Sequence, residues 1–226
     1  QQIRSQPDVG LIRSWFEYCR SNHDGKCKVT SEQVQNLRVI DCSTTAIIPA
    51  PTACSYVALS YVWGNHKTDE DGNGPSRDEE GLPVEINPPI ELPVNLPAVV
   101  KDAVKFTKKL GFDYLWIDKY CIDQTNGGLM QQQIMSMDRI YQNAEFTIIA
   151  AAGDDENHGL LGVGETRRPV QPTAQIGNLT FTSSARDPFQ EIIRSKWFSR
   201  GWTFQEGILT RRRLAFTKQQ IYFECD

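Results

Sequence analysis

Long apolar runs, a surplus of basic residues and closely spaced cysteines are all missing from this sequence. No apolar stretch approaches the ~20 residues that a helix needs to cross a bilayer, so we expect no membrane partner. Lysine and arginine number 24 against 28 acidic residues, which gives a net charge of −4 and no positive field to hold a nucleic acid. The six cysteines in 226 residues are too few for a disulfide scaffold. We therefore expect a cytoplasmic protein with reduced thiols.

Several common catalytic motifs are absent as well. The chain contains neither the GxxxxGK[ST] phosphate loop nor the GxSxG nucleophile motif, and the glycines of the segment 159–164 stand in the wrong order for a dinucleotide fingerprint. The three histidines, His23, His66 and His158, fall in separate loops. A hydrolase that uses histidine as its general base is therefore not expected.

Apolar segments alternate with stretches of helical periodicity along most of the chain. Such a βαβ succession predicts a three-layer α/β domain with a mainly parallel, flavodoxin-like sheet and helices on both faces. We expect the strands at 55–62, 113–118 and 146–152 to be parallel neighbours. The remaining expected elements are strands at 37–41, 213–216 and 220–223, helices at 9–19, 96–110, 130–144 and 198–208, and a hairpin near 170–182.

One stretch, 65–97, differs in composition from the rest. It holds six of the twelve prolines and eight acidic residues against Lys67 and Arg77. Such a segment cannot bury much apolar surface, so we interpret it as a long surface insertion. We expect residues 1–36 to form an N-terminal extension packed on a domain that covers 37–226. The chain ends directly after an expected strand, so we interpret it as a piece of a longer protein.

A group of cysteine and histidine residues lies near the N-terminus. The spacing Cys19-x3-His23-x3-Cys27, with Cys42 as a fourth ligand, could hold zinc. This is not a standard zinc-knuckle spacing, and the alternative is that these cysteines are small packed side chains. We otherwise expect all six cysteines to be unoxidised, and no cofactor to be required.

Ligands of doubly wound sheets bind beyond the carboxyl ends of the strands. In this sequence the residues expected at that edge are Ser60, Tyr61 and Trp63 after one strand, and the segment 118–124 after the next.

Three sequence blocks resemble the motifs of a known protein family. Tyr56-Val-Ala-Leu-Ser-Tyr-Val-Trp-Gly64, Leu115-Trp-Ile-Asp-Lys-Tyr-Cys-Ile-Asp-Gln124 and Arg200-Gly-Trp-Thr-Phe-Gln-Glu206 occur in the order seen in the HET domain, the heterokaryon incompatibility domain of filamentous fungi. The likeness covers about 37–216. One departure is the segment Gly127-Gly-Leu-Met130, where members of that family usually carry an acidic residue near position 129.

The resemblance implies a module that triggers cell death when genetically unlike fungal cells fuse. It also implies self-association and contact with other incompatibility proteins. HET domains are in turn similar to TIR domains, some of which cleave NAD+ with a glutamate in a Trp-x-x-x-Glu-like segment. The matching segment here runs from Trp202 to Glu206, so the resemblance makes Glu206 the candidate catalytic residue.

The chemistry fits a single carboxylate. Cleavage of the nicotinamide–ribose bond passes through an oxocarbenium-like state, as in glycoside hydrolysis, and the nicotinamide leaves as a neutral molecule. One carboxylate can therefore stabilise the developing charge, and an aromatic face can bind the cationic ring. The candidate substrate-binding residues are Ser60, Tyr61, Trp63, Asp118, Asp123, Arg200 and Trp202.

Structural alternatives exist for each candidate. Thr203 and Glu206 match a capping box, in which the carboxylate would bond the start of its own helix. The tryptophans could be core anchors, and Asp118 could cap the loop that follows it. At the level of function, the alternative to an NAD+ hydrolase is a non-enzymatic module that signals by self-assembly.

Overall fold

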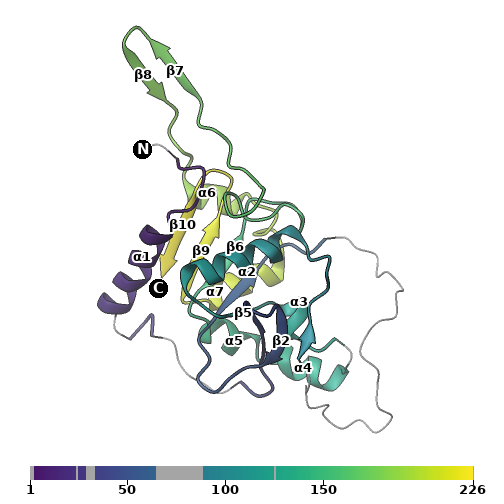
Figure 1. Cartoon of the computed structure of the whole chain (residues 1–226). Helices are drawn as coiled ribbons and strands as arrows, with labels where there is room; N and C mark the ends of the chain where they lie inside the picture. Colours follow the sequence, from purple (N-terminus) through teal and green to yellow (C-terminus); the bar gives the residue numbers. More distant parts are fainter. Residues whose placement is uncertain (1–2, 24, 29–33, 65–88, 125, 226) are drawn as a thin grey trace.

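The computed structural model describes residues 3–23, 25–28, 34–64, 89–124 and 126–225 (Figure 1). Its strands are β1 (Arg38–Asp41), β2 (Ala46–Pro49), β3 (Tyr56–Ser60), β4 (Ile90–Glu91), β5 (Tyr114–Trp116), β6 (Thr147–Ala150), β7 (Thr173–Ile176), β8 (Leu179–Thr182), β9 (Arg212–Phe216) and β10 (Ile221–Cys225). Its helices are α1 (Val9–Asn22), α2 (Ala98–Leu110), α3 (Asp118–Cys121), α4 (Gly127–Met135), α5 (Met137–Asn143), α6 (Pro188–Ile193) and α7 (Gly201–Leu209).

A parallel centre with antiparallel edges makes up the main sheet. Its eight strands lie in the order β10-β9-β6-β3-β5-β1-β2-β4. The pairs β3–β5, β3–β6 and β6–β9 are parallel, whereas β10, β1, β2 and β4 join antiparallel. The expected α/β class is confirmed, as is the expected parallel arrangement of β3, β5 and β6.

The central strands are buried because their residues are apolar on both faces. All five residues of β3 and all four of β6 are buried, which is typical of parallel strands covered by helices on each side. The helix α2 packs against the sheet through one apolar stripe that includes Val100, Ala103 and Leu110. It ends at Gly111, whose φ of 90° is a left-handed conformation that glycine adopts without strain.

Helices cover both faces of this sheet. The α1 helix contacts α2 and β10, and α5 contacts α7. The crossover from β3 to β5 contains α2, the crossover from β6 to β9 contains α7, and the two run in opposite directions along the sheet. Because parallel crossovers are right-handed, α2 and α7 lie on opposite faces. Aromatic rings join α1 to the sheet: Phe16 stacks on Phe146 at 4.4 Å and meets Phe223 edge-on.

The structure differs from the sequence expectation at five elements. The expected helix at 130–144 is two helices, because Ser136, with φ −102° and ψ 5°, interrupts it and its hydroxyl donates to the Gln132 carbonyl. The short strands β2 and β4 and the short helices α3 and α6 were not expected. All four have too few residues to show periodicity.

The acidic, proline-rich insertion is described only in part. Residues 65–88 lie outside the described residues. The end of the segment pairs with the sheet, because β4 extends its edge beside β2. The expectation of a surface excursion therefore stays a prediction for most of its length.

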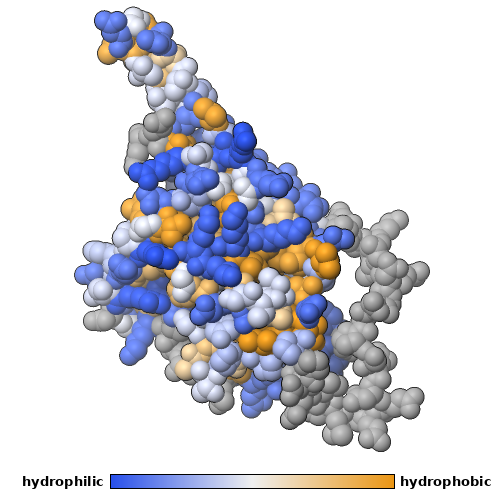
Figure 2. Space-filling model, viewed as in Figure 1, coloured by the Kyte–Doolittle hydropathy of each residue, from blue (hydrophilic) through white to orange (hydrophobic). Residues whose placement is uncertain are grey.

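A two-stranded hairpin, β7–β8, projects away from the main sheet (Figure 1). All eight of its strand residues are exposed, and three of them are large and apolar: Ile176, Leu179 and Phe181. Figure 2 shows hydrophobic side chains at the tip of this projection. Among the described residues, no helix has both the length and the apolar character that crossing a membrane requires.

Candidate functional site

The point where the chain reverses direction across the sheet lies between β3 and β6. From β3 the chain crosses to β5 on one side, then returns to β6 on the other. The loops that leave the two strands diverge there, and ligands of such folds bind at this crevice. Ser60 ends β3, and Tyr61 and Trp63 follow it.

A chain of short hydrogen bonds crosses this point. The indole Nε1 of Trp197 donates to Ser60 Oγ at 2.6 Å, and Ser60 Oγ donates to Glu206 Oε2 at 2.5 Å. All three side chains are buried, and Glu206 is only 6% exposed. A hydroxyl that both accepts and donates in this way fixes the orientation of the carboxyl group.

The capping-box alternative for Glu206 is wrong. The helix α7 begins at Gly201, and no side chain caps its first turn. The Thr203 hydroxyl donates backwards, to the carbonyls of Trp197 and Arg200, and Thr203 lies inside the first turn and not at the N-cap position, which Arg200 occupies. Glu206 stands in the second turn and reaches across to Ser60 on β3.

Close packing holds α7 at this position. Gly207 lies against the Trp197 ring, so a Cβ added there would lie 2.9 Å from the ring. At the end of the helix the Thr210 hydroxyl donates to the Glu206 carbonyl and bonds the Thr147 hydroxyl on β6. Glu206 is therefore fixed by its own helix as well as by Ser60.

Burial raises the pKa of Glu206 from 4.5 to about 7. The hydrogen bond from Ser60 opposes this shift, the charge of Asp118 adds to it, and Arg200 opposes it. The carboxyl group therefore changes its charge close to neutral pH, which is where a general base or an electrostatic catalyst is effective.

Two buried phenols flank the carboxyl group. The Tyr141 hydroxyl is close enough to Glu206 for burial and that charge to raise its pKa well above 10. Burial and Asp118 likewise raise the pKa of Tyr61. The Tyr141 hydroxyl lies within hydrogen-bonding reach of the Glu206 carboxyl, whereas the Tyr61 hydroxyl has no hydrogen-bond partner among the described residues. The Tyr61 hydroxyl is therefore a potential donor to a polar ligand, and the role of Tyr141 was missed because it sits in an apolar helical stripe.

Asp118 joins the same group of charges from the carboxyl end of β5. Burial raises its pKa to about 6, against the hydrogen bonds that it accepts from the Lys119 backbone and from Trp63. The bond from the Lys119 backbone, at 2.7 Å, agrees with a role in ordering the loop. Trp63 is 39% exposed, and the Lys119 ammonium lies 6.0 Å from its ring centre.

The remaining candidates, Arg200, Asp123 and Trp202, differ in the contacts that they make. Arg200 donates to the Tyr61 carbonyl at 3.3 Å, and its charge acts on both Glu206 and Asp118. Asp123 lies beside Arg38 on β1, with 3.6 Å between its carboxylate and the guanidinium. Trp202 is 60% exposed. The structure thus gathers Ser60, Tyr61, Trp63, Asp118 and Arg200 around Glu206, whereas Asp123 pairs with Arg38 and Trp202 is largely exposed.

A pocket of about 130 Å³ opens at the carboxyl end of β6. Four cations dominate its lining, and Lys196 directly precedes Trp197 of the hydrogen-bonded chain. Sequence reasoning missed it because its residues come from three separate segments. They are Ala151, Ala152, Asp154, Arg186, Gln190, Glu191, Arg194, Ser195, Lys196 and Lys218.

The Cys/His cluster exists, with one change of membership. Cys19, His23 and Cys27 lie together, but the fourth neighbour is Cys225 at the end of β10. The expectation for Cys42 is wrong, because it is buried beside β1 and its thiol faces the Ile40 carbonyl. None of the six cysteines, all of which the structure describes, forms a disulfide.

A doubly wound α/β domain with a buried carboxyl at its switch point is the class of protein that this fold and site define. Residues 56–206 match the family model of the heterokaryon incompatibility protein (HET). The chain belongs to this family, and the resemblance inferred from the three blocks is confirmed.

The chain is also similar to heterokaryon incompatibility protein 6, OR allele, of Neurospora crassa. The two are 25% identical over 206 residues, which cover 74% of this chain and 29% of that protein. The chain thus spans less than a third of the length of this relative. No solved structure matches the chain.

Proposed function

We propose that this HET domain is a cell-death effector of fungal heterokaryon incompatibility that hydrolyses NAD+ with Glu206 as its catalytic residue. The observation that carries the proposal is the buried Glu206 carboxyl, oriented by Ser60 and Trp197 at the switch point of the sheet. Family membership and the relative named heterokaryon incompatibility protein 6 support the role in incompatibility.

The reaction needs little from the protein besides charge and position. The bond between ribose C1′ and the nicotinamide nitrogen breaks, its electron pair stays on that nitrogen, and neutral nicotinamide leaves. Water then adds to C1′ and releases a proton, which gives ADP-ribose. Ionised Glu206 stabilises the positive charge that develops on the ribose, and its raised pKa suits it to take the proton.

The surrounding groups can bind the rest of the substrate. The unpartnered hydroxyl of Tyr61 suits a ribose oxygen, and the half-exposed Trp63 ring suits the cationic nicotinamide. Arg200 and the cationic pocket at the end of β6 suit the pyrophosphate. No metal or organic cofactor takes part in this scheme.

Because Glu206 is buried, this activity requires a conformational change that admits the substrate. With 6% of the residue exposed, a ribose reaches the carboxylate only after a neighbouring side chain moves. Self-association that shifts the loops after β3 and β5 would provide that movement. Activity is therefore expected to depend on protein concentration.

The experiment compares nicotinamide release from NAD+ by the wild type and by Glu206→Gln at high protein concentration. Glutamine keeps the size and the bond to Ser60 but removes the charge. We expect a loss of roughly 100- to 1000-fold in turnover, as for other preorganised electrostatic groups. Glu17→Gln, at an exposed position of α1, is the matched control and should keep full activity. No release from the assembled wild type, or equal release from both proteins, would exclude the proposal.

The second candidate function is a non-enzymatic module that signals by self-assembly. The specific observation in its favour is the projecting β7–β8 hairpin, which exposes Ile176, Leu179 and Phe181 by 68%, 65% and 52%. Exposed apolar strands of this kind pair readily with another chain. This function requires assembly without NAD+ cleavage, so the same nicotinamide assay separates the two.

A further inference from the structure

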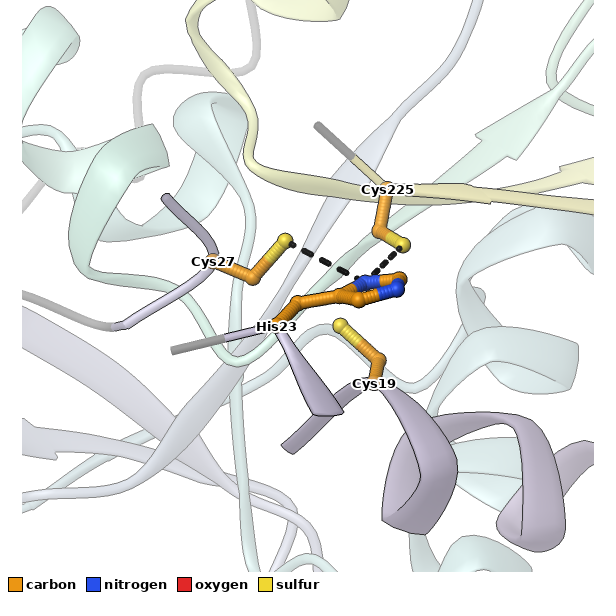
Figure 3. A group of neighbouring side chains, drawn as sticks. All are labelled: Cys19, His23, Cys27 and Cys225. Atoms are coloured by element: carbon orange, nitrogen blue, oxygen red, sulfur yellow. Dashed lines mark hydrogen bonds between the residues drawn. The ribbon is translucent and has the colours of Figure 1, made fainter. Parts of the chain in front are cut away.

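Four potential metal ligands from opposite ends of the chain point toward one another (Figure 3). Their ligand atoms, three thiol sulfurs and one imidazole nitrogen, all lie within 4.8 Å of one another. The His23 Nδ1 atom faces the sulfurs, at 3.2 Å from Cys225 Sγ and 4.0 Å from Cys27 Sγ. The group comprises Cys19, His23, Cys27 and Cys225.

These distances match the edges of a tetrahedral zinc site. With Zn–S near 2.3 Å and Zn–N near 2.0–2.1 Å, a tetrahedron has S···S edges of about 3.8 Å and S···N edges of about 3.6 Å. The two S···N distances, 3.2 and 4.0 Å, bracket the second value. Three cysteines and one histidine are also an established donor set for structural zinc.

Separate elements bring the ligands together. Cys19 lies in the last turns of α1, and His23 caps the end of that helix, one turn further along. Cys27 follows in the next loop and is 1% exposed, as is Cys19. Cys225 is the last residue of β10. The i, i+4 spacing puts Cys19 and His23 on one face of the helix, toward the strand.

A buried arginine supports the sulfurs from outside the cluster. Arg212 on β9 is 3% exposed, donates from Nε to Cys19 Sγ at 3.2 Å and donates from one terminal nitrogen to the Cys27 carbonyl at 2.6 Å. Three thiolates around a divalent cation leave an excess of one negative charge. Arg212 lies between this charge and the Glu145 carboxylate, 3.6 Å away, and Arg20 also pairs with Glu145, so the two guanidiniums offset both. A hydrogen bond from the Arg212 Nε–H to the Cys19 sulfur would hold the thiolate in the orientation that a metal ion requires.

We propose that Cys19, His23, Cys27 and Cys225 bind one Zn²⁺ ion that joins α1 to the end of β10. All four coordination positions come from the protein, so the site is structural and not catalytic. Zinc binding displaces three thiol protons and involves no oxidation. The ligands flank the family-matched segment 56–206 on both sides, so the ion joins the segment before the matched one to the segment after it.

The test measures metal content in the wild-type protein, purified without chelators and without metal-affinity chromatography. We expect about one zinc per chain, with at least about tenfold less in Cys225→Ser. Cys54→Ser removes a half-buried thiol outside the cluster and should keep the full zinc content. A wild type without zinc, an intact mass that shows a disulfide in the cluster, or a Cys225→Ser protein that keeps its zinc would overturn the proposal.

A second measurement covers the case in which Cys225→Ser does not fold. Wild-type protein from which zinc has been removed is titrated with Co²⁺ and its visible spectrum is recorded. Tetrahedral cobalt with thiolate ligands gives intense visible bands, which should saturate at about one equivalent. A spectrum without thiolate-to-cobalt bands would overturn the assignment even if some zinc copurifies.

Discussion

Glu206 is an acid placed where its charged form is unfavourable. It is buried against Ser60 and close to a second carboxyl, Asp118, and both pKa values are raised, to about 7 and about 6. Proteins tolerate such an arrangement mainly at functional sites, because a neutral side chain would pack there at lower cost. We therefore expect Glu206 to do more than hold its helix.

The raised pKa of Glu206 makes stability depend on pH. The folded state binds the proton more tightly than the unfolded state, so the free energy of unfolding falls as pH rises from 4.5 to about 7. Glu206→Gln removes this effect, so relative to the wild type it should gain up to roughly 3 kcal/mol between about pH 5 and about pH 8. Urea unfolding at the two pH values measures the difference. A parallel pH dependence in both proteins would show that the carboxyl is not perturbed.

At the element scale, α7 depends on a close approach to Trp197. In most helices Gly→Ala stabilises by up to about 1 kcal/mol, but at Gly207 the new methyl would lie 2.9 Å from the Trp197 ring. We expect Gly207→Ala to destabilise by about 1–3 kcal/mol. Gly201→Ala, in the same helix with nothing within 4 Å, is the matched control and should be neutral or stabilising. Denaturant midpoints compare the two, and equal effects would contradict the packing described here.

Element by element, the sequence predicted the long pieces and missed those that depend on tertiary contacts. The run at 55–62 is nearly continuous in apolar residues and the stripe from Val100 to Leu110 has helical periodicity, and both appear close to their expected bounds as β3 and α2. The break at Ser136 has only a single polar residue as its signal.

The candidate site was predictable to a similar degree. The gathering of Ser60, Asp118 and Glu206 follows from strand order plus the three blocks. The sequence could not show that the fourth member of the Cys/His cluster is Cys225 and not Cys42. That membership depends on the packing of β10 beside α1.

At the scale of the whole molecule, two features lie outside the sheet core: the cluster that joins the chain ends and the projecting hairpin. The cluster joins α1 and the loop after it to β10, which follows α7 and β9 along the chain. The hairpin offers an unpaired two-stranded edge within the described residues. The first would stabilise the domain, and the second would connect it to a further copy.

The hairpin gives a direct prediction on assembly. Ile176→Thr with Leu179→Thr keeps strand propensity but removes apolar surface from a cross-strand pair. We expect light scattering to show concentration-dependent association of the wild type and at least about tenfold weaker association of the double variant. Val94→Thr, at a site 94% exposed in a loop, is the control and should associate as the wild type does. A wild type that stays monomeric, or a double variant that associates equally, would remove the hairpin from the account.

Catalysis by Glu206 is tested most directly by the pH profile of nicotinamide release from NAD+, taken with the wild type and Glu206→Gln at equal concentration. If the carboxylate acts in its charged form, the rate of the wild type should fall about tenfold per pH unit below about pH 7 and level off above it. The variant should be slower by roughly 100- to 1000-fold and should lack this transition. A wild type that cleaves NAD+ with a rate independent of pH between about 5.5 and 8.5, or a variant with the same profile, would contradict Glu206 catalysis.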